Sequence, residues 1–348
     1  MTRVRQGCES GPSSMKAIVL SAFGSADNFA AAELPMPEVR KGEVRIKVRA
    51  VSFNPVDYQI RKGQPESRLV RSMILGQDLS GSVDAAHEDV SDFSAGDEVF
   101  GYVCNLASSG TYAEYVSVPA GLVAKKPASL THEQTAAVPV AGVTASLALN
   151  KARADKTKSL FIAGGAGGVG TFAILLARQL GVRNLVTTAG NAKSRAYLIE
   201  HCGLSDDQIV DYKDGGFIER ARKRNGGRFD VALDLVGGRM LSACCALLAV
   251  DGNLASIVEA PGRDDFETLF QRNASFHSVG ANAYSLTDDP ADWRKYREML
   301  EHLSRLFDSG ALAPPPINIL GRLSPEVVKH AHALLESNAV QGKLVMTC

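Results

Sequence analysis

The stretch that decides the fold is Ser159-Leu-Phe-Ile-Ala-Gly-Gly-Ala-Gly-Gly-Val-Gly-Thr171. Leu160–Ala163 is a short apolar run typical of a buried strand, and glycines follow it at three-residue spacing. The apolar segment Thr171–Leu180 then favours a helix. A strand, a glycine-rich turn and a helix in this order predict a dinucleotide-binding unit.

The chemistry of such a unit gives each glycine a role. Gly164 permits the tight turn, Gly167 lets the backbone approach a pyrophosphate, and Gly170 lets the helix pack closely on the strand. The phosphates are expected at the helix N-terminus, where free N–H groups and the helix dipole favour negative charge. The alternative is a glycine-rich loop without a ligand, which the flanking strand and helix disfavour. The predicted cofactor contacts in this turn are Gly164, Gly165, Ala166, Gly167, Gly168, Val169 and Gly170.

Length and composition limit the classes of protein to consider. The 348 residues are enough for two domains, and the apolar fraction of 45% predicts a globular core. Lys and Arg number 38, as do Asp and Glu, so the charge balance points to no nucleic-acid or membrane partner. Six cysteines without paired spacing, and an N-terminus without an apolar segment, favour a cytoplasmic protein.

The N-terminal part of the chain is predicted to be rich in strands. Residues 1–14 are polar and are expected to form a flexible tail, and the sequence leaves open whether Met1 or Met15 starts the native chain. The segments 42–50 and 110–118 alternate polar and apolar residues with period two. Frequent glycines between such strands favour a bent, antiparallel, barrel-like domain.

From Thr131 onward the pattern changes to alternating helices and strands. Thr131-His-Glu-Gln134 is a capping box that opens a helix. Alternation of strands and helices predicts a doubly wound parallel sheet, so the fold class is α/β. Strands are expected at 160–163, 184–188, 208–212, 229–234, 252–258, 276–280 and 342–346, and helices at 193–201, 240–250, 292–307 and 324–336.

Several motifs occur in order along the chain from Met15 to its end. Together they resemble the medium-chain dehydrogenase/reductase superfamily, in its zinc-independent quinone oxidoreductase (zeta-crystallin-like) branch. The motifs are Asn54-Pro-Val-Asp57 with Arg61-Lys-Gly63, Gly76-Gln-Asp78, Gly96-Asp-Glu-Val99, Gly110-Thr-Tyr-Ala-Glu-Tyr115, Ala141-Gly-Val-Thr-Ala145, the glycine turn and Asp234-Leu-Val-Gly-Gly238.

The resemblance implies a division of the chain. A GroES-like β-rich catalytic domain is expected at 15–135, a Rossmann NADP-binding domain at 136–283, and a C-terminal segment at 284–348 that completes the catalytic domain. It also implies a homodimer and an active site in a cleft between domains.

Zinc relatives hold a catalytic ion with Cys and His ligands, and often a structural ion with four cysteines. In this sequence the first ligand position falls in Ser52-Phe-Asn-Pro55, which contains no cysteine, and Gln77 replaces the His of the usual Gly-His-Glu. An amide is a poor zinc ligand beside imidazole. Only Cys104 lies where a structural cysteine cluster is expected, so we predict that both zinc sites are absent.

The choice of dinucleotide depends on the residues that follow the second strand. NAD sites usually place an acidic residue about 20 residues after the glycines, and none occurs between Thr171 and Ile199. Lys193 and Arg195 can instead pair with a 2′-phosphate, although both are also ordinary residues for the first turn of a helix. NADPH is therefore favoured over NADH. Thr188, Asn191 and Ser194 are predicted hydrogen-bond donors to it.

Further cofactor contacts are predicted where other strands end. Asp234 ends a strand, and Val236 and Gly237 bring backbone near the cofactor; Gly280 and Ala281 do so after the sixth strand. Lys343 is predicted to reach the cofactor phosphates, or alternatively to be a solvated lysine at a strand end.

The predicted catalytic residues are Asn54, Tyr58 and Thr144. Asn54 would donate its amide N–H to a carbonyl oxygen, or cap the turn before Pro55. Tyr58 would donate a proton or stack on a quinone, or else pack in the core. The resemblance places Thr144 beside the nicotinamide, and the alternative is that it packs within a helix.

Four neighbouring residues are weaker candidates for a role in the pocket. Asp57 is predicted chiefly as a helix cap, and Tyr102 as a half-buried aromatic residue of a strand. Gln77 and Asp78 are predicted chiefly to hold the barrel together.

These residues predict a zinc-independent, NADPH-dependent oxidoreductase that reduces a quinone or an activated carbonyl or enone by hydride transfer. Two alternatives stay open. One is a reductase of the carbon–carbon double bond of alkenals and enones, and the other is a non-catalytic NADPH-binding protein with a structural or regulatory role.

Overall fold

The computed structural model describes residues 4–6, 12–103, 108–287, 289–337 and 340–348. The chain forms two compact units, of which the first comprises Met1–Val140 with Asn282–Cys348 and the second Ala141–Ala281. The first and last parts of the chain thus share one unit. Within the described residues, none of the helices combines the length and the apolar character that a bilayer crossing needs.

The first unit is a β-rich barrel-like domain, which confirms the expected GroES-like class. Its sheet has the order β15-β16-β4-β5-β6-β8, with β7 paired to β4 and β1 paired to β5. These strands are β1 (Val4–Gln6), β4 (Glu43–Ser52), β5 (Asp78–His87), β6 (Glu98–Tyr102), β7 (Tyr115–Pro119), β8 (Val123–Lys125), β15 (Ile317–Arg322) and β16 (Lys343–Thr347). A separate hairpin consists of β2 (Ser14–Leu20) and β3 (Phe29–Pro35).

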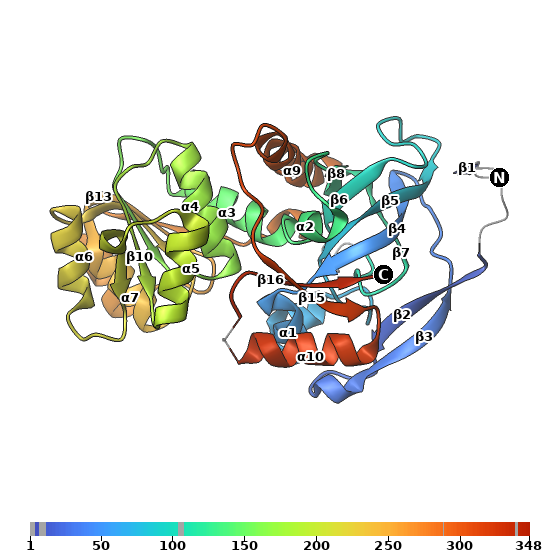
Figure 1. Ribbon diagram of the computed structural model, residues 1–348, viewed down its shortest axis with the longest axis horizontal. Coiled ribbons are helices and arrows are strands. Elements are labelled where there is room, and N and C mark those ends of the chain that lie inside the picture. The colour runs from blue at the N-terminus through green and yellow to red at the C-terminus, as the bar shows by residue number, and fades with distance from the viewer. Residues whose placement is uncertain (1–3, 7–11, 104–107, 288, 338–339) are drawn as a thin grey trace. The chain divides into compact units, whose positions relative to one another are not determined.

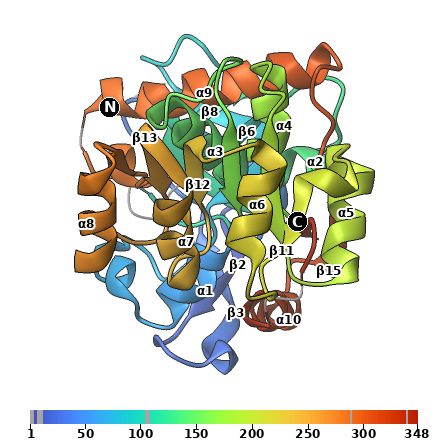
Figure 2. The ribbon, with the colours of Figure 1, turned by 90° about the vertical axis from the view of Figure 1, so that its left-hand side faces the viewer.

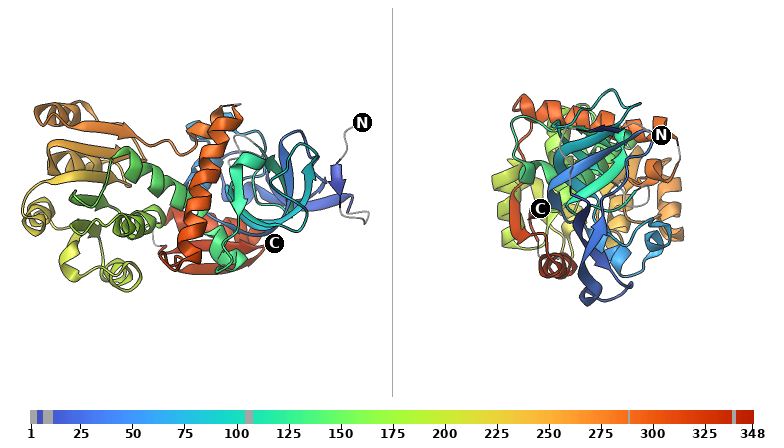
Figure 3. Two further views of the ribbon diagram at one scale, coloured as in Figure 1. Left: turned by 90° about the horizontal axis from the view of Figure 1, so that it is seen from above. Right: turned by 90° about the vertical axis from the view of Figure 1, so that its right-hand side faces the viewer.

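The C-terminal segment completes this unit. Strand β16 pairs antiparallel with β4, so residues almost three hundred positions apart are neighbours, as the adjacent red and blue strands in Figure 1 show. Helix α9 (Pro290–Asp308) packs beside β6 and β8, and α10 (Pro325–Glu336) contacts α1 (Pro55–Arg61); both helices can be followed in Figure 3. The remaining helical segments are η1 (Ala26–Asn28), η2 (Pro65–Leu69), η3 (Ala120–Leu122), α2 (His132–Ala136) and η5 (Ala283–Leu286). Alternating positions of β4, such as Val44, Ile46 and Val48, are buried in the core.

The second unit is a doubly wound parallel sheet, as predicted. The strand order is β11-β10-β9-β12-β13-β14, and every pairing is parallel. The strands are β9 (Leu160–Ala163), β10 (Leu185–Ala189), β11 (Ile209–Asp211), β12 (Phe229–Asp234), β13 (Leu248–Ser256) and β14 (Ser275–Ser278). This order reverses between β9 and β12, where nucleotides bind in sheets of this kind.

Helices cover both faces of this sheet (Figures 1 and 2). Helices α4 (Gly168–Gln179) and α5 (Ala192–Cys202) pack together, while α7 (Arg239–Leu247) lies between α6 (Phe217–Asn225) and α8 (Arg263–Gln271). Helix α3 (Pro139–Lys151) and the short η4 (Asp206–Gln208) complete the described elements.

Two of the differences between the predicted and the observed elements have strand pairing as their cause. The helix expected over 240–250 ends at Leu247, because Leu248 already pairs with Phe229 in the sheet and begins β13. An apolar run of this length is compatible with a helix or a buried strand, and pairing decides between them. Val4–Gln6 lie within the expected flexible tail but pair with Ala85–His87 as β1; the rest of 1–11 lies outside the described residues.

Candidate active site

The turn after β9 contains glycines that the fold itself requires. Gly164 has a φ of +88°, which non-glycine residues rarely adopt. A Cβ atom on Gly165 would lie 2.1 Å from Thr187 Oγ1, and one on Gly170 would lie 2.2 Å from the Gly164 carbonyl oxygen. The turn therefore packs so tightly against β10, and the start of α4 against the turn, that only hydrogen fits at these positions.

Gly167 is different, because nothing within the fold requires a glycine there. It precedes α4 with an ordinary φ of −79°, is exposed, and a Cβ on it would make an ordinary contact of 3.5 Å with the Gly164 carbonyl oxygen. Ala166, Gly168 and Val169 beside it are partly exposed. The first N–H groups of α4 have no acceptor within the helix, so this open turn fits a pyrophosphate.

Two predicted cofactor contacts beside this turn have structural partners. Thr188 Oγ1 accepts a hydrogen bond from the Gly164 N–H at 2.9 Å. Asn191 Oδ1 accepts one from the Ser194 N–H at 2.8 Å and so caps α5. Both side chains therefore hold the backbone at the carboxyl edge of the sheet, where their predicted role would also place them.

The two basic residues of the first turn of α5 differ in their surroundings. Arg195 pairs with Asp206 and donates to the Ile209 carbonyl oxygen at 3.0 Å. Its guanidinium group thus ties α5 to β11, which the sequence analysis did not foresee. Lys193 is exposed near the start of α5, so the predicted contact with a 2′-phosphate stays a prediction for Lys193.

Tyr212 is a residue of this edge that sequence reasoning missed. Its ring covers Gly190, where a Cβ atom would lie 2.5 Å from the ring. It follows β11 as Gly190 follows β10, and the parallel pairing of these two strands brings both to one edge. Gly190, two residues after the strand expected at 184–188, was the sequence signal that another group approaches the backbone closely there.

The other strand ends meet at the same edge because the sheet is parallel. Asp234 Oδ1 accepts hydrogen bonds from the N–H groups of Val236 (3.1 Å) and Gly237 (2.9 Å), and thereby shapes the turn after β12. The Val236 side chain is exposed. Gly280 and Ala281 follow β14, and Gly280 is exposed. The predicted cofactor residues of this unit are thus gathered along one edge of one sheet.

Three other predicted pocket residues occupy different settings. Thr144 is buried in α3 and belongs to the second unit. Tyr58 is partly exposed on α1, with the Lys62 ammonium 5.3 Å from its ring centre. Tyr102 is buried, not half-buried as expected, and its hydroxyl donates to Asn282 Oδ1.

The first unit contains a buried cluster of charged and polar groups around Asp78. Oδ1 of this carboxylate accepts from the Val140 N–H at 2.7 Å. Oδ2 accepts from Ser52 Oγ and from Asn54 Nδ2, the latter at 2.8 Å, and the Lys343 ammonium lies 3.3 Å away. Both Asp78 and Lys343 are almost fully buried, so each compensates the charge of the other.

The contacts in this cluster bear on the roles predicted for Lys343 and Asn54. Lys343, predicted to reach the cofactor phosphates, directs its ammonium to Asp78 and to Asn54 Oδ1, and it is not the solvated lysine of the alternative. Asn54 thereby uses both ends of its amide inside the cluster, which limits its freedom to bind a substrate oxygen.

Asp57 acts as the helix cap that was expected. Its Oδ2 accepts from the Asn54 N–H at 2.8 Å at the start of α1. Burial, with a smaller contribution from the nearby Asp78 carboxylate, raises the pKa of Asp57 to about 7. The folded chain therefore holds this proton more tightly than the unfolded chain does.

The raised pKa has a consequence for stability. Between about pH 4 and pH 7 the folded state binds more protons at Asp57, so this group's contribution to stability is complete below that window and is lost as the pH rises through it. We expect Asp57→Asn, which does not titrate, to gain stability relative to the natural protein by at most about 1.4 kcal/mol per pH unit across the window. Urea unfolding at a series of pH values measures this. Asp27→Asn, at an exposed carboxylate, is the control, and parallel curves for Asp57→Asn and the natural protein would refute the expectation.

A second buried network connects α10 to the barrel. Arg61 Nε donates to His332 Nδ1 at 3.3 Å, and the other ring nitrogen of His332 lies 3.3 Å from the Tyr112 hydroxyl. Burial, and secondarily the charge of Arg61, lowers the pKa of His332 to about 3, so the ring is neutral. Since Arg61 only donates, the proton of His332 is on Nε2. An ion pair between Arg61 and Glu336 anchors the network.

The donors present do not fit a zinc site of the kind that the superfamily implies. Gln77 is completely buried, and neither its Nε2 nor its Oε1 has a hydrogen-bond partner. Among the described residues no group of three or more His, Cys, Asp and Glu side chains could hold a metal ion. Cys104 lies outside the described residues.

Comparisons with known proteins identify family models and relatives that this chain resembles. Residues 40–128 match the model described as alcohol dehydrogenase GroES-like domain, and residues 204–346 match that described as zinc-binding dehydrogenase. The chain is 29% identical to 2-methylene-furan-3-one reductase from Solanum lycopersicum, over 96% of this chain and 79% of that protein. It is also 29% identical to a zinc-type alcohol dehydrogenase-like protein from Staphylococcus aureus, over 90% and 92% of the two chains.

Solved structures of oxidoreductases are also similar to this chain. The quinone oxidoreductase from Coxiella burnetii is 30% identical, with a TM-score of 0.80 over 96% of this chain and 99% of that chain. The glycine turn, the parallel sheet and the β-rich unit together define an NAD(P)-dependent oxidoreductase. The chain belongs to the medium-chain dehydrogenase/reductase superfamily.

Proposed function

We propose that this protein is a zinc-independent, NADPH-dependent reductase of a quinone or of an activated carbonyl or enone. The observation that carries the proposal is the donor set of the first unit. Amide, hydroxyl, carboxylate and ammonium groups surround Asp78, and Gln77 offers a neutral amide in place of a metal-binding imidazole. Electrophilic acceptors of this kind do not need a metal ion to polarise them.

The preference for NADPH rests on the end of β10. The chain continues there as Gly190, Asn191, Ala192 and Lys193, with no carboxylate to accept the hydroxyl groups of an NAD ribose. The exposed ammonium group of Lys193 favours a 2′-phosphate. When bound, the reduced nicotinamide supplies a hydride, and solvent supplies the proton that completes reduction of the acceptor.

Reduction of a carbon–carbon double bond is the second candidate. It is favoured by the similarity to a 2-methylene-furan-3-one reductase, whose name describes an enone substrate. Quinones and enones share a carbonyl group conjugated to a carbon–carbon double bond. The same residues therefore suit both, and measurement has to choose between them.

The test is NADPH consumption with 1,4-benzoquinone, an alkenal and a simple ketone, repeated with NADH. We expect turnover of the quinone or the alkenal, with NADPH preferred. Turnover of the simple ketone alone would contradict the proposal. Tight NADPH binding without any turnover would instead favour the non-catalytic alternative.

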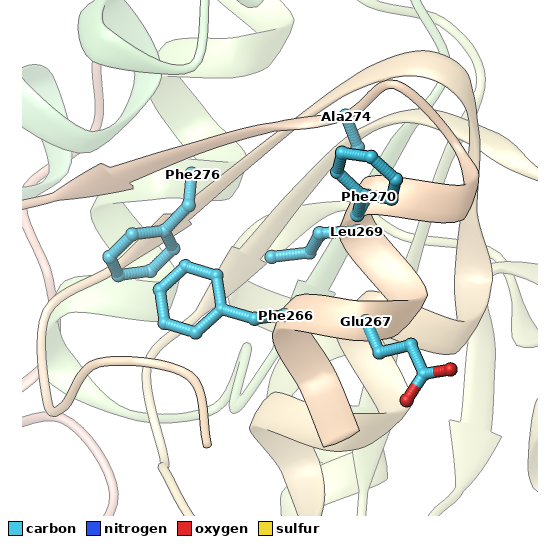
Figure 4. Close-up of a pocket in the computed structure, with 6 residues that line it drawn as sticks. All are labelled: Phe266, Glu267, Leu269, Phe270, Ala274 and Phe276. Carbon is cyan, nitrogen blue, oxygen red and sulfur yellow. The ribbon is translucent and has the colours of Figure 1, made fainter. Parts of the chain in front are cut away.

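We also propose that the protein is a homodimer, and that a second copy covers the exposed edge of β14. Aromatic and aliphatic side chains from α8 and β14 line an open pocket at this edge (Figure 4): Phe266, Leu269, Phe270, Ala274 and Phe276, with Glu267 at the rim. Phe270 is 87% exposed, and a sheet edge beside apolar residues favours pairing with another chain.

Phe270→Asp is expected to convert the dimer to a monomer, because it places a charge in the apolar interface. Light scattering after size-exclusion chromatography measures this. Ile199→Asp on α5 is a matched control at another exposed apolar residue. A dimer that survives Phe270→Asp would exclude this edge.

A further inference from the structure

An open polar pocket lies at the amino edge of the parallel sheet in the second unit. Three loops form it, and each leads into a strand: 156–159 into β9, 183–184 into β10, and 225–228 into β12. Its volume is about 330 Å³, which is the size of a small-ligand site. The pocket thus lies at the strand ends opposite to those that form the predicted cofactor edge.

Positive charge predominates in the lining of this pocket. The cationic groups are Lys156, Lys158, Arg183 and Arg228, against the one carboxylate of Asp230. Lys158 is half-buried and the other three cationic residues are exposed, so a ligand can reach them. Within the described parts of the chain, none of the four makes an ion pair or a hydrogen bond through its side chain. A bound anion would relieve the repulsion between these like charges.

The carboxylates close to these cations have other partners. Asp230 Oδ2 accepts from the N–H and from the hydroxyl of Ser159, each at 2.8 Å. Asp155, in the same loop as the two lysines, accepts through Oδ1 from the N–H and the hydroxyl of Thr157, at 2.7 and 2.5 Å. Both carboxylates therefore fix the loop before β9, and Asp230 reduces the positive charge of the pocket without cancelling it.

Hydrogen bonds hold the three loops in place. The Leu160 N–H donates to the Asn184 carbonyl oxygen at 2.9 Å, and Ser159 joins the first loop to Asp230 in β12. Within the third loop, Asn225 Nδ2 donates to the Arg228 carbonyl oxygen at 2.8 Å. The backbone that carries the cationic side chains is thus ordered before any ligand arrives, which lowers the entropic cost of binding.

This pocket is separate from the predicted cofactor turn. Strand β9 begins at Leu160, next to the pocket, and ends at Ala163, next to Gly164. A strand advances by about 3.3 Å per residue, so its two ends are about 10 Å apart. A ligand in the pocket and a dinucleotide at the carboxyl edge can therefore be bound at the same time.

We propose that this pocket binds a small anion that carries two or more phosphate groups. Phosphate oxygens accept charge-assisted hydrogen bonds from lysine and arginine side chains, and arginine can donate two in parallel. The cations come from three separate loops, which two linked phosphate groups can contact together more readily than one. Inorganic pyrophosphate and the phosphate chain of a nucleotide share this chemistry. The inference is independent of the proposed function, because the pocket contains none of the residues assigned to the cofactor or the acceptor.

The test is isothermal titration calorimetry of inorganic pyrophosphate, and separately of ADP, into the full chain at constant ionic strength. The protein is first saturated with NADPH or NADH, whichever binds more tightly, so that the glycine turn is occupied. We expect one site per chain for pyrophosphate. Lys158→Gln combined with Arg183→Gln is expected to raise its Kd about tenfold or more, because each substitution removes a charged donor. Equal affinities for the two probes would identify free phosphate groups as sufficient, and tighter binding of ADP would identify a nucleotide.

Lys41→Gln combined with Arg263→Gln is the matched control. It removes the same charge at exposed residues outside the pocket, so the Kd should not change. Arg228→Gln, in the third loop, should weaken binding as well, and it keeps the test valid if the first double variant does not fold. Equal weakening in both double variants would show attraction to the overall charge and overturn the inference. Absence of pyrophosphate binding to the cofactor-saturated protein would also overturn it.

Discussion

Replacing Asp78 with Asn is expected to lower the free energy of unfolding by about 3–5 kcal/mol, because it leaves the buried ammonium of Lys343 without a counter-charge. Three further donors, from Ser52, Asn54 and the Val140 backbone, also point at this carboxylate. Denaturant unfolding of the full chain measures the change. The expected loss is among the largest for a single substitution in this protein.

Two variants make this prediction specific. Asp84→Asn removes a carboxylate that pairs with Arg45 but is 29% exposed, and about 0–1 kcal/mol is expected there. Adding Lys343→Met to Asp78→Asn removes the unpaired charge and should restore part of the stability. An Asp78→Asn variant as stable as Asp84→Asn would contradict the buried ion pair.

Gly167→Ala is expected to weaken NADPH binding about tenfold or more, equivalent to about 1.4 kcal/mol or more, with little change in stability. The fold leaves room for this methyl group, since its nearest neighbour would be 3.5 Å away. A bound pyrophosphate would need the same space. Titration of NADPH against the protein, followed by fluorescence, measures the dissociation constant.

Gly170→Ala is the contrasting variant for this turn. A Cβ there would lie 2.2 Å from the Gly164 carbonyl oxygen, so stability itself should fall. Gly167 is thus expected to serve the ligand, whereas Gly170 serves the packing of the fold. An unchanged dissociation constant in Gly167→Ala would contradict the placement of the phosphates.

Local patterns explain why much of the fold was predictable. The period-two alternation over 42–50 predicted β4, and the strand-turn-helix around Gly164 predicted the parallel sheet. Helices α6 and α8 were not predicted. Each is nine residues long and consists mostly of charged and polar residues, so its few apolar residues form only a short periodic pattern. Strand β15 was missed because its residues are mostly half-buried or exposed and follow three prolines.

The candidate site was predictable only in part. The residues of the glycine turn are adjacent in sequence, so their roles follow from spacing. The partnership of Lys343 with Asn54 and Asp78 joins positions that are far apart in the chain, and no local pattern reports it. The same holds for Arg61 with His332. Gln77 was noticed through the resemblance as an exchange of a metal ligand, whereas its unpaired amide is visible only in the structure.

Whether the protein works without zinc is measured by the rate of quinone or alkenal reduction after treatment with a chelator, with elemental analysis showing that the protein contains no zinc. We expect the treated protein to consume NADPH at the rate of the untreated protein, and more efficiently than it consumes NADH. Loss of turnover on chelation, restored by added zinc, would contradict it.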